Sequence, residues 1–186
     1  MPNLILFNMM TVDGLFEGPN QEIDWHQVDA EFNDFAIEQL DSAGALIFGR
    51  KTYEMMASYW PTTGAIKDDP EVAKRMNSIH KIVFSTTLEN AGWINTKLVK
   101  RIVKEEIENL KQQSGKDIFI LGSANLAANF RECGLIDEYR IMVNPIILGK
   151  GKPLFHASDS CENLNLYKAR TFQNGNVLLI YRSISE

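Results

Sequence analysis

The sequence predicts an α/β domain built around a largely parallel sheet, and three features indicate it. Short apolar runs alternate with amphipathic helical segments along most of the chain, which is typical of βαβ units. These apolar runs are continuous rather than alternating, as expected for strands covered on both faces. After Gly134 the pattern changes to strand-like segments without a long helix between them, and Asn174-Gly175 is a strong hairpin signal. We expect a single domain over residues 1–186, with antiparallel strands at its C-terminal end.

Seven strands are expected. Four buried ones are Leu4 to Met9, Ala45 to Phe48, Ile79 to Phe84 and Ile118 to Leu121. Three later ones are Tyr139 to Leu148, Leu164 to Phe172 and Val177 to Ser183. Mixed sheets of this kind are common.

Five helices are predicted, mostly from apolar residues spaced three or four positions apart. Their inward-facing residues are Phe32, Phe35, Ala36 and Leu40 in the first, Tyr53, Met56 and Trp60 in the second, Val103, Ile107 and Leu110 in the fourth, and Leu126, Phe130 and Cys133 in the fifth. The third helix is predicted from its start at Asp69-Pro70-Glu71, where proline takes the first helical position and an acid the first turn. Cys133 is expected to be a small core residue.

Composition excludes several classes of protein. The 186 residues are 45% hydrophobic and 23% charged, with a formal net charge of -5 and a pI near 5.3. Without a block of basic residues, nucleic acid is not an expected partner. The two cysteines have no paired spacing and are expected to be reduced thiols. No apolar run is long enough for a membrane span or a secretory signal, so a cytoplasmic location is expected.

Two strand-to-helix junctions have the features of a phosphate site. One strand runs into Gly49-Arg50-Lys51-Thr52, and another runs into Gly122-Ser123-Ala124-Asn125. Glycine lets an anion approach the backbone, and a helix N-terminus offers free N–H groups with a partial positive charge. Both junctions are expected at the carboxyl edge of the parallel strands, where ligands collect.

The alternative for either junction is a tight turn in which Thr52 or Ser123 caps the helix. The two junctions together, one of them carrying Arg50 and Lys51, favour a bound pyrophosphate. A third strand end is followed by the hydroxyl run Ser85-Thr86-Thr87, which suits a phosphate ester but is also common in turns.

Motifs of other nucleotide-binding and metal-dependent proteins are missing. Neither G-x-x-x-x-G-K-[ST] nor G-x-G-x-x-G after the first strand occurs. The run Gly149 to Lys152 follows a late strand, and a mobile turn is predicted there. His26, His80 and His156 lack metal-like spacing, so each is expected to be structural or on the surface. The deaminase zinc motif H-x-E with P-C-x-x-C is absent, and no hydrolase triad can be resolved.

Several segments, taken in order, resemble the dihydrofolate reductase superfamily. They are Thr11 to Phe16, Leu46 to Glu54, Ile82 to Thr87 and Ile120 to Ser123. Two later segments, Gly134 to Glu138 and Pro145 to Phe155, resemble more specifically the C-terminal reductase domain of the bifunctional riboflavin-biosynthesis enzyme and its stand-alone relatives. The resemblance spans nearly the whole chain, and the ordered set is more specific than any single motif.

This resemblance implies a dihydrofolate-reductase-like three-layer sandwich of about eight mostly parallel strands, with helices on both faces and NADPH across the carboxyl edge. The phosphates would meet Gly49, Arg50, Lys51 and Thr52 at one helix start, and Leu121, Gly122, Ser123, Ala124 and Asn125 at the other. Ser85 and Thr86 would meet the 2′-phosphate, with Arg101 beside it or stacked on adenine. Asp13 and Gly14 would lie in the loop that closes over the nicotinamide. A homodimer is also implied.

Two positions depart from the family pattern. The glycine pair that accompanies the family's cis peptide is Gly122-Ser123 here. The arginine that grips the glutamate tail of folate aligns with Ile79, and an apolar side chain cannot bind a carboxylate. The second departure disfavours folate as the substrate.

The predicted function is an NADPH-dependent reductase that transfers hydride to a C=N or C=O bond of a small heterocyclic or ribosylaminopyrimidine-type substrate. The cofactor carries the hydride chemistry, and a proton is also needed. Alignment of the first helix places the family's buried acid at Glu31, with Asp13 and Asp24 as competitors. The alternative for Glu31 is a first-turn acid favoured by the helix dipole. The alternative function is a nucleotide-binding module without turnover, which would use the same cofactor site.

Overall fold

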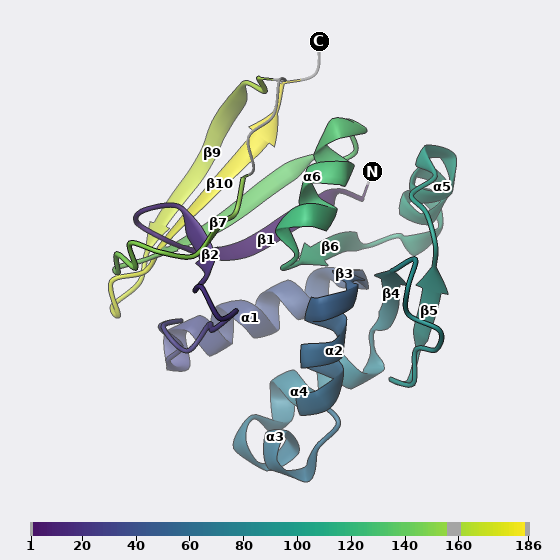
Figure 1. Ribbon diagram of the computed structural model, residues 1–186, viewed down its shortest axis with the longest axis horizontal. Coiled ribbons are helices and arrows are strands. Elements are labelled where there is room, and N and C mark those ends of the chain that lie inside the picture. Colours follow the sequence, from purple (N-terminus) through teal and green to yellow (C-terminus); the bar gives the residue numbers. More distant parts are fainter. Residues whose placement is uncertain (1, 156–160, 185–186) are drawn as a thin grey trace.

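The computed structural model describes residues 2–155 and 161–184 around an eight-stranded sheet (Figure 1). Across the sheet the strands run in the order β5-β4-β3-β6-β1-β7-β10-β9. Their bounds are β1 Leu4–Thr11, β3 Ala43–Gly49, β4 His80–Phe84, β5 Thr96–Val99, β6 Asp117–Leu121, β7 Glu138–Asn144, β9 Leu164–Thr171 and β10 Val177–Ser183. A separate two-stranded sheet pairs β2 (Leu15–Glu17) with β8 (Lys152–Pro153).

The large sheet is parallel except at one end. The strands from β5 across to β7 pair in parallel, whereas β10 is antiparallel to both β7 and β9. The prediction of a mostly parallel sheet that ends in antiparallel strands is therefore confirmed. Because parallel strands share their carboxyl edge, the segments that follow the neighbouring strands β4, β3 and β6 emerge side by side.

Helices cover both faces of the sheet and give three layers. Their bounds are α1 Ala30–Ser42, α2 Arg50–Tyr59, α3 Thr63–Asp68, α4 Pro70–Ser78, α5 Lys104–Ser114 and α6 Ala124–Glu132. In Figure 1, α1 to α4 gather in the lower half of the view, and α5 and α6 lie in the upper half. None of the helices in residues 2–155 and 161–184 is long and apolar enough to cross a membrane.

Alternate residues of β1 contribute to the two cores between these layers. Leu4 and Leu6 are fully buried in the cluster that includes residues of α5 and α6. Ile5, also fully buried, belongs to the cluster that includes residues of α1, α2 and α4. Burial of each such side chain contributes roughly 1.5–3 kcal/mol. The continuous apolar runs of the sequence thus correspond to strands that are covered on both faces.

Four short elements were not predicted from the sequence: β2, β5, β8 and α3. Strand β5 pairs only with β4 at the edge of the sheet, so it needs little apolar content. Helix α3 has six residues, too few for a periodic pattern, and begins where the Thr62 side chain accepts a hydrogen bond from the Ala65 N–H. Conversely, the strand predicted to reach Leu148 ends at Asn144, because Pro145 has no N–H for the ladder.

A charged residue, Lys81, is fully buried within β4. Its Nζ donates hydrogen bonds to the carbonyl oxygens of Met76 and Ile79, at 2.8 and 2.7 Å, where α4 ends. The same nitrogen lies 4.5 Å from the centroid of the Trp93 ring. The free carbonyls and negative dipole end of the helix, together with the aromatic face, compensate for burying the charge.

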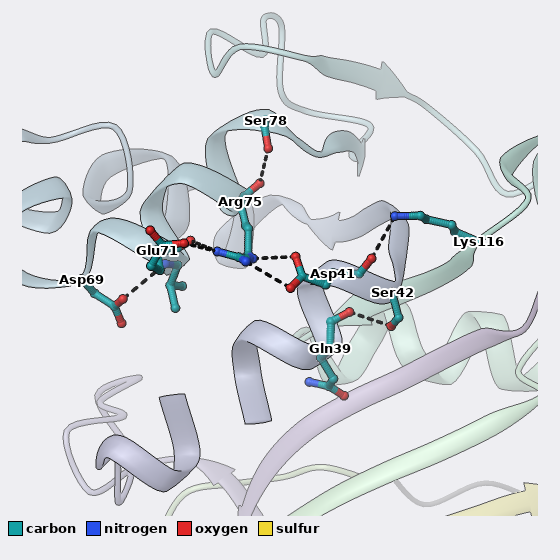
Figure 2. Close-up of polar contacts among 9 residues, drawn as sticks. Gln39, Asp41, Ser42, Asp69, Glu71, Arg75, Ser78 and Lys116 are labelled. Carbon is teal, nitrogen blue, oxygen red and sulfur yellow. Dashed lines mark hydrogen bonds and ion pairs between the residues drawn. The ribbon is translucent and has the colours of Figure 1, made fainter. Parts of the chain in front are cut away.

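An ion-pair cluster joins α1 to α4 on the outer side of the molecule (Figure 2). Arg75 donates from Nε and Nη2 to the two carboxylate oxygens of Asp41, at 2.7 and 3.0 Å, and from Nη1 to Glu71 at 2.7 Å. Hydrogen bonds from Arg75 lower the pKa of both carboxyl groups. Lys116 donates to the Asp41 carbonyl oxygen at 2.9 Å. The cluster holds the end of α1, which leads directly into β3.

We predict that Arg75→Met lowers the melting temperature at neutral pH and makes the melting temperature less dependent on pH in the acidic range. The pKa values of Asp41 and Glu71 are lower in the folded protein than their ordinary 3.8 and 4.5. Their contribution to stability is therefore present above those ordinary values and is lost as the pH falls through the folded-state values. Thermal unfolding from about pH 3 to about pH 7 measures this dependence. Lys67→Met, at an exposed site in α3, is the control, and identical pH profiles for Arg75→Met and the native protein would contradict the prediction.

Candidate functional site

A groove of about 690 Å³ lies where β4, β3 and β6 end side by side. Each of these strands is followed by residues that line it: Phe84 to Thr87 after β4, Gly49 to Thr52 around the start of α2, and Ser123 and Asn125 after β6. The remaining lining residues are Lys100, Arg101 and Ile102 after β5, Phe16, Glu17 and Lys152 from the small sheet, and Leu126, Asn129, Glu132 and Cys133 from α6 and its end. The volume is within the range of small-molecule sites, roughly 300–1,000 Å³.

The two strand-to-helix junctions predicted as phosphate sites contact each other directly. A Cβ atom on Gly49 would clash with the Ser123 hydroxyl, and one on Gly122 would lie 2.9 Å from Cγ2 of Thr52. Each glycine thus accepts the side chain of the opposite junction in the space that its own side chain would take. Both helix starts are thereby packed together at one end of adjacent strands.

Neither of these helix starts carries a side-chain cap. Gly49 is the N-cap of α2 and Ser123 the N-cap of α6, and neither of these cap residues makes a capping hydrogen bond through a side chain. Of the tight-turn alternative, Ser123 is the N-cap residue of α6 but makes no capping hydrogen bond through its side chain, and Thr52 is not the N-cap of α2. Away from the groove, by contrast, Asp29, Thr62 and Asp69 cap α1, α3 and α4 through their side chains.

The charged residues at the two helix starts also favour a bound anion. The first turns of α2 and α6 contain no acidic residue, whereas α5, which also lacks a cap, has Glu105 and Glu106 in its first turn. Helix α2 instead begins with Arg50 and Lys51. Cations at a helix N-terminus oppose the dipole, so this arrangement favours a bound anion.

Ser123 has left-handed backbone geometry. Its φ is 59°, directly after Gly122 with φ 65°. For a residue other than glycine this region costs of order 1–3 kcal/mol and is found often at functional sites. All peptide bonds in residues 2–155 and 161–184 are trans, so the junction differs from the cis geometry of the family pattern.

The third strand end combines hydroxyl groups with two cations. The Ser85 hydroxyl is buried and accepts hydrogen bonds from the N–H groups of Thr87 and Leu88, at 3.2 and 2.9 Å, which closes a turn. Thr86 is exposed and lines the groove. Lys100 and Arg101 line the same wall. The Ser85 hydroxyl thus closes the turn, and the side chains of Thr86, Lys100 and Arg101 lie at the groove beside it, with Lys100 donating to the Leu88 carbonyl oxygen.

Nine of the thirteen residues predicted to bind the cofactor line the groove: Gly49, Arg50, Lys51, Thr52, Ser85, Thr86, Arg101, Ser123 and Asn125. The other four, Gly14, Leu121, Gly122 and Ala124, do not. Ala124 is buried in the core, Leu121 packs against the opposite cluster, and Gly122 is covered by Thr52. The binding role of all thirteen stays a prediction.

The groove is basic although the chain is acidic overall. Arg50, Lys51, Lys100, Arg101 and Lys152 face it, against the carboxylates of Glu17 and Glu132. A local excess of positive charge in a concave site attracts anionic ligands. Lys100 and Lys152 were not among the predicted site residues. Lys100 follows β5 directly, so a prediction of β5 would have indicated it, but β5 was not predicted either.

The small sheet forms the wall opposite α6. β2 and β8 pair antiparallel, and Asp13 accepts hydrogen bonds from the N–H groups of Leu148 and Gly149, at 3.3 and 2.7 Å. The segment from Gly149 to Lys152, where a mobile turn is predicted, is bonded at both ends, through the Gly149 N–H and through the pairing of Lys152 with Glu17, and its mobility stays a prediction. Hydrogen bonds from the Thr11 side chain and from the Gly149 N–H lower the pKa of Asp13, which favours its anion over a proton donor.

Glu31 lies outside the residues that line the groove. Its carboxylate accepts from Arg170 Nη2 at 3.1 Å and from the Gln173 N–H at 2.9 Å. The Gln173 N–H first, and Arg170 second, lower its pKa. These contacts favour the carboxylate form of Glu31, which links α1 to the β9–β10 hairpin. The role of Glu31 as a general acid stays a prediction. Asp24, the third candidate, is exposed.

Cys133 was predicted to be a core residue, and this is wrong. Helix α6 ends at Glu132, so Cys133 is its C-cap, and its side chain is exposed at the groove. Leu126 and Phe130 do face the core as predicted. Gly134 follows with φ 62°, the left-handed residue expected after a helix.

No group of three His, Cys, Asp or Glu side chains that could hold a metal ion is found within 2–155 and 161–184. His26 is partly buried, and burial lowers its pKa to about 4. His80 is exposed, and His156 lies outside the described residues.

The fold and the groove define a dihydrofolate-reductase-like α/β protein with a basic groove at the carboxyl edge of its sheet. Comparison with known families identifies the family, because residues 2–178 match the RibD C-terminal domain. The chain belongs to the family of the RibD C-terminal domain.

Individual relatives agree with this family. The chain is 36% identical over 184 residues to the uncharacterized protein YyaP of Bacillus subtilis (strain 168), covering 96% of this chain and 93% of YyaP. The structure of a putative riboflavin biosynthesis protein from Shewanella sp. PV-4 superposes with a TM-score of 0.76 at 24% identity, covering 98% of this chain and 99% of the other. A pyrimidine reductase-like protein from Corynebacterium diphtheriae gives a TM-score of 0.70 at 15% identity, covering 100% and 93%. These findings confirm the predicted fold and the resemblance.

We predict that the contact between the two junctions can be broken and restored by paired substitutions. Gly49→Ala introduces a Cβ that clashes with the Ser123 hydroxyl, so it should lower the free energy of unfolding by about 1–3 kcal/mol. Gly49→Ala combined with Ser123→Gly should recover most of this loss, because the hydroxyl is removed. Denaturant unfolding of the single and double variants measures the coupling. Additive effects of the two substitutions would show that the junctions do not constrain each other.

Proposed function

We propose that this protein is an NADPH-dependent reductase of the RibD type, with the cofactor in the basic groove. The observation that carries the proposal is the pair of uncapped helix starts packed against each other, with Arg50 and Lys51 at one of them. A pyrophosphate is attracted by the positive dipole ends of both helices and offsets the cations at the start of α2. The name of the Corynebacterium neighbour, a pyrimidine reductase-like protein, supports the reaction class.

The residues of the groove fit the parts of NADPH. The starts of α2 and α6 would hold the pyrophosphate, and Thr86, Lys100 and Arg101 would take the 2′-phosphate through hydroxyl and charge-assisted hydrogen bonds. Bound there, NADPH supplies the hydride. The protein's part is to hold the cofactor and exclude water with the β2–β8 wall. The substrate proposed is a small heterocycle or a ribosylaminopyrimidine, with folate disfavoured by Ile79.

We predict a preference for NADPH over NADH, and a contribution of Arg50 to the binding of NADPH. Arg50→Ala should weaken NADPH binding by roughly 1.5–3 kcal/mol, the scale of a hydrogen bond to a charged group. Titration calorimetry with both nucleotides measures this. Lys67→Ala removes one positive charge away from the groove and should leave both affinities unchanged. Equal affinity of the native protein for NADH and NADPH would overturn the assignment of the 2′-phosphate site.

We predict that Gly122→Val abolishes cofactor binding while the protein still folds. Valine cannot adopt the left-handed φ of 65° without strain, and its Cβ would displace Thr52 from the start of α2. Circular dichroism and calorimetry separate folding from binding. Val substitution at Gly92, where a Cβ meets no atom within 4 Å, is the control. Normal NADPH binding by a folded Gly122→Val would refute the predicted pyrophosphate site.

We predict that Glu31→Gln reduces stability above acidic pH, and its turnover decides whether Glu31 also acts as the general acid. The Gln173 N–H and Arg170 hold its pKa below the ordinary 4.5, so its contribution to stability is present at neutral pH and is lost as the pH falls through the folded-state value. Kinetics and thermal unfolding across pH measure the two effects. A loss of turnover of ~10²-fold with unchanged NADPH affinity would give Glu31 the role of general acid.

The reaction itself is tested by NADPH oxidation against dihydrofolate, pterins and the ribosylaminopyrimidine intermediate. Oxidation with the ribosylaminopyrimidine and not with dihydrofolate supports the proposal. The alternative of a nucleotide-binding module is favoured by one observation, because Asp13 and Glu31 are both held as anions. Tight NADPH binding without oxidation by any member of the panel would establish that alternative.

We also propose that the protein forms a homodimer through β9. This strand is at the edge of the sheet, with no strand of residues 2–155 and 161–184 paired along its outer side, and Leu166 and Tyr167 on it are 57% and 59% exposed. Such an edge is a template for pairing with a second chain. Light scattering on the native protein and on Leu166→Asp tests the proposal, since the variant should be a monomer. A monomeric native protein overturns it.

A further inference from the structure

The segment from Ser85 to Ile102 meets the groove at both of its ends. Its first three residues and its last three, 85–87 and 100–102, line the groove. The part between them contains β5 and no helix, and β5 pairs only with β4 at the edge of the sheet. Because an edge strand has a neighbour on one side only, the position of this segment depends strongly on its other contacts.

Two contacts join the ends of the segment to each other. The Ser85 N–H donates to the Val99 carbonyl oxygen at 3.0 Å, and Lys100 donates from Nζ to the Leu88 carbonyl oxygen. The two groups of lining residues are therefore held together as one unit. A displacement of the middle of the segment would move both groups.

Trp93 anchors the middle of the segment in the core. Its side chain is 5% exposed. Its backbone N–H donates to the Tyr53 hydroxyl at 2.9 Å, and its Nε1 donates to Oδ1 of Asn77 at 2.7 Å. Tyr53 belongs to α2 and Asn77 to α4, so one residue fixes the segment against two helices. The start of α2 itself lines the groove, which makes Trp93 a link between neighbouring parts of the site.

The ammonium group of Lys81 faces the Trp93 ring. Its Nζ lies 4.5 Å from the centroid of that ring and donates to three carbonyl oxygens at the end of α4, the third being that of Asn77 at 3.2 Å. No ion pair within residues 2–155 and 161–184 includes Lys81. The carbonyl oxygens and the aromatic face thus take the place of a carboxylate, and a cation–π contact is strongest when the cation is desolvated.

Core packing alone does not explain a lysine at this position. By alternation Lys81 shares its face of β4 with Val83, which is fully buried in the cluster that includes residues of α2 and α4. Burying an ammonium group costs more than burying an alkyl chain, and well-packed apolar residues often replace buried charges without loss of stability. What the ammonium adds is a directed attraction for the ring of Trp93.

We propose that Lys81 is a positioning residue for the groove. Its ammonium group holds the Trp93 ring, and Trp93 holds the segment so that the hydroxyl and basic side chains at its two ends face the 2′-phosphate of a bound nucleotide. This inference rests on the proposed function for the identity of the ligand. The attachment of the segment through Lys81 and Trp93 is a property of the protein alone and is tested separately.

The binding test compares NADP⁺ with NAD⁺, which differ only in the 2′-phosphate. By calorimetry, Lys81→Met should bind NADP⁺ about tenfold or more weakly than the native protein, the scale of one hydrogen bond to a charged group, and NAD⁺ equally well. Ile5→Val is the control, because it destabilises the same core cluster from β1, three strands away from β4. It should keep the native ratio of the two affinities, since a general loss of stability does not select between the nucleotides.

A double-mutant cycle tests whether Lys81 acts through Trp93. Trp93→Leu removes the aromatic face and should lower the affinity for NADP⁺ as Lys81→Met does, and the two substitutions together should have little further effect. Trp93→Phe, the conservative variant, keeps an aromatic face and should retain most of the preference for NADP⁺. If Lys81→Met does not fold, the comparison of Trp93→Leu with Trp93→Phe carries the test.

Hydrogen exchange without ligand gives a readout that does not depend on the cofactor. Peptides that cover residues 86–95 should exchange faster in Lys81→Met and in Trp93→Leu than in the native protein, because the segment is less firmly attached. Peptides from α6 should exchange at the native rate in both variants.

The outcomes separate this inference from the proposed function. A native ratio of NADP⁺ to NAD⁺ affinity in Lys81→Met, or an equal loss for both nucleotides, overturns the positioning role. Native exchange rates in residues 86–95 of the variants overturn it as well, and so does equal affinity of the native protein for the two nucleotides. If the native protein binds neither nucleotide, the proposed function fails by itself, and the exchange rates decide whether Lys81 holds the segment.

Discussion

The packing of the α2 start against the α6 start is the constraint on which the site depends. Strands β3 and β6 are neighbours, so the helices that follow them must begin close together. Gly49 and Gly122 allow this, because each leaves space for the hydroxyl residue of the other junction. The result is two helix ends with partial positive charge at one point, with no cap or first-turn acid to balance them. An anionic ligand is the group that this arrangement is suited to hold.

The second wall of the groove depends on a contact between distant parts of the chain. Asp13 binds the backbone at 148–149, and a Cβ on Gly151 would clash with the carbonyl oxygen of Glu17. These close contacts hold the β2–β8 sheet opposite α6 and so bring Phe16 and Lys152 to the groove. Asp13 therefore contributes to the shape of the site through the backbone it binds. The same contacts lower its pKa, which is the opposite of what a proton donor requires.

Much of the fold was predictable because it depends on residues close in sequence. The buried strands of the parallel sheet, the start of α4 after Asp69 and the left-handed Gly134 all follow from local patterns. The two junctions were also predictable, since a glycine between a strand and a helix is a local signal. Elements without such a signal were missed: α3 is a single short helix, and β5 is recognisable only by its pairing with β4. Cys133 fits the helical spacing, but the helix ends one residue before it.

The sequence by itself determined the order of the longer strands and helices, and the residues that follow the buried parallel strands, because these features are set by short-range periodicity and turn chemistry. It also determined the family, through motifs that keep their order along the chain. Only the tertiary structure decided which side chains meet. Lys81 is tolerated in the core because the end of α4 reaches it, Glu31 is paired because the β9–β10 hairpin lies beside α1, and Lys100 joins the groove because β5 adds to the edge of the sheet. Each of these contacts joins separate elements, so no local pattern specifies it.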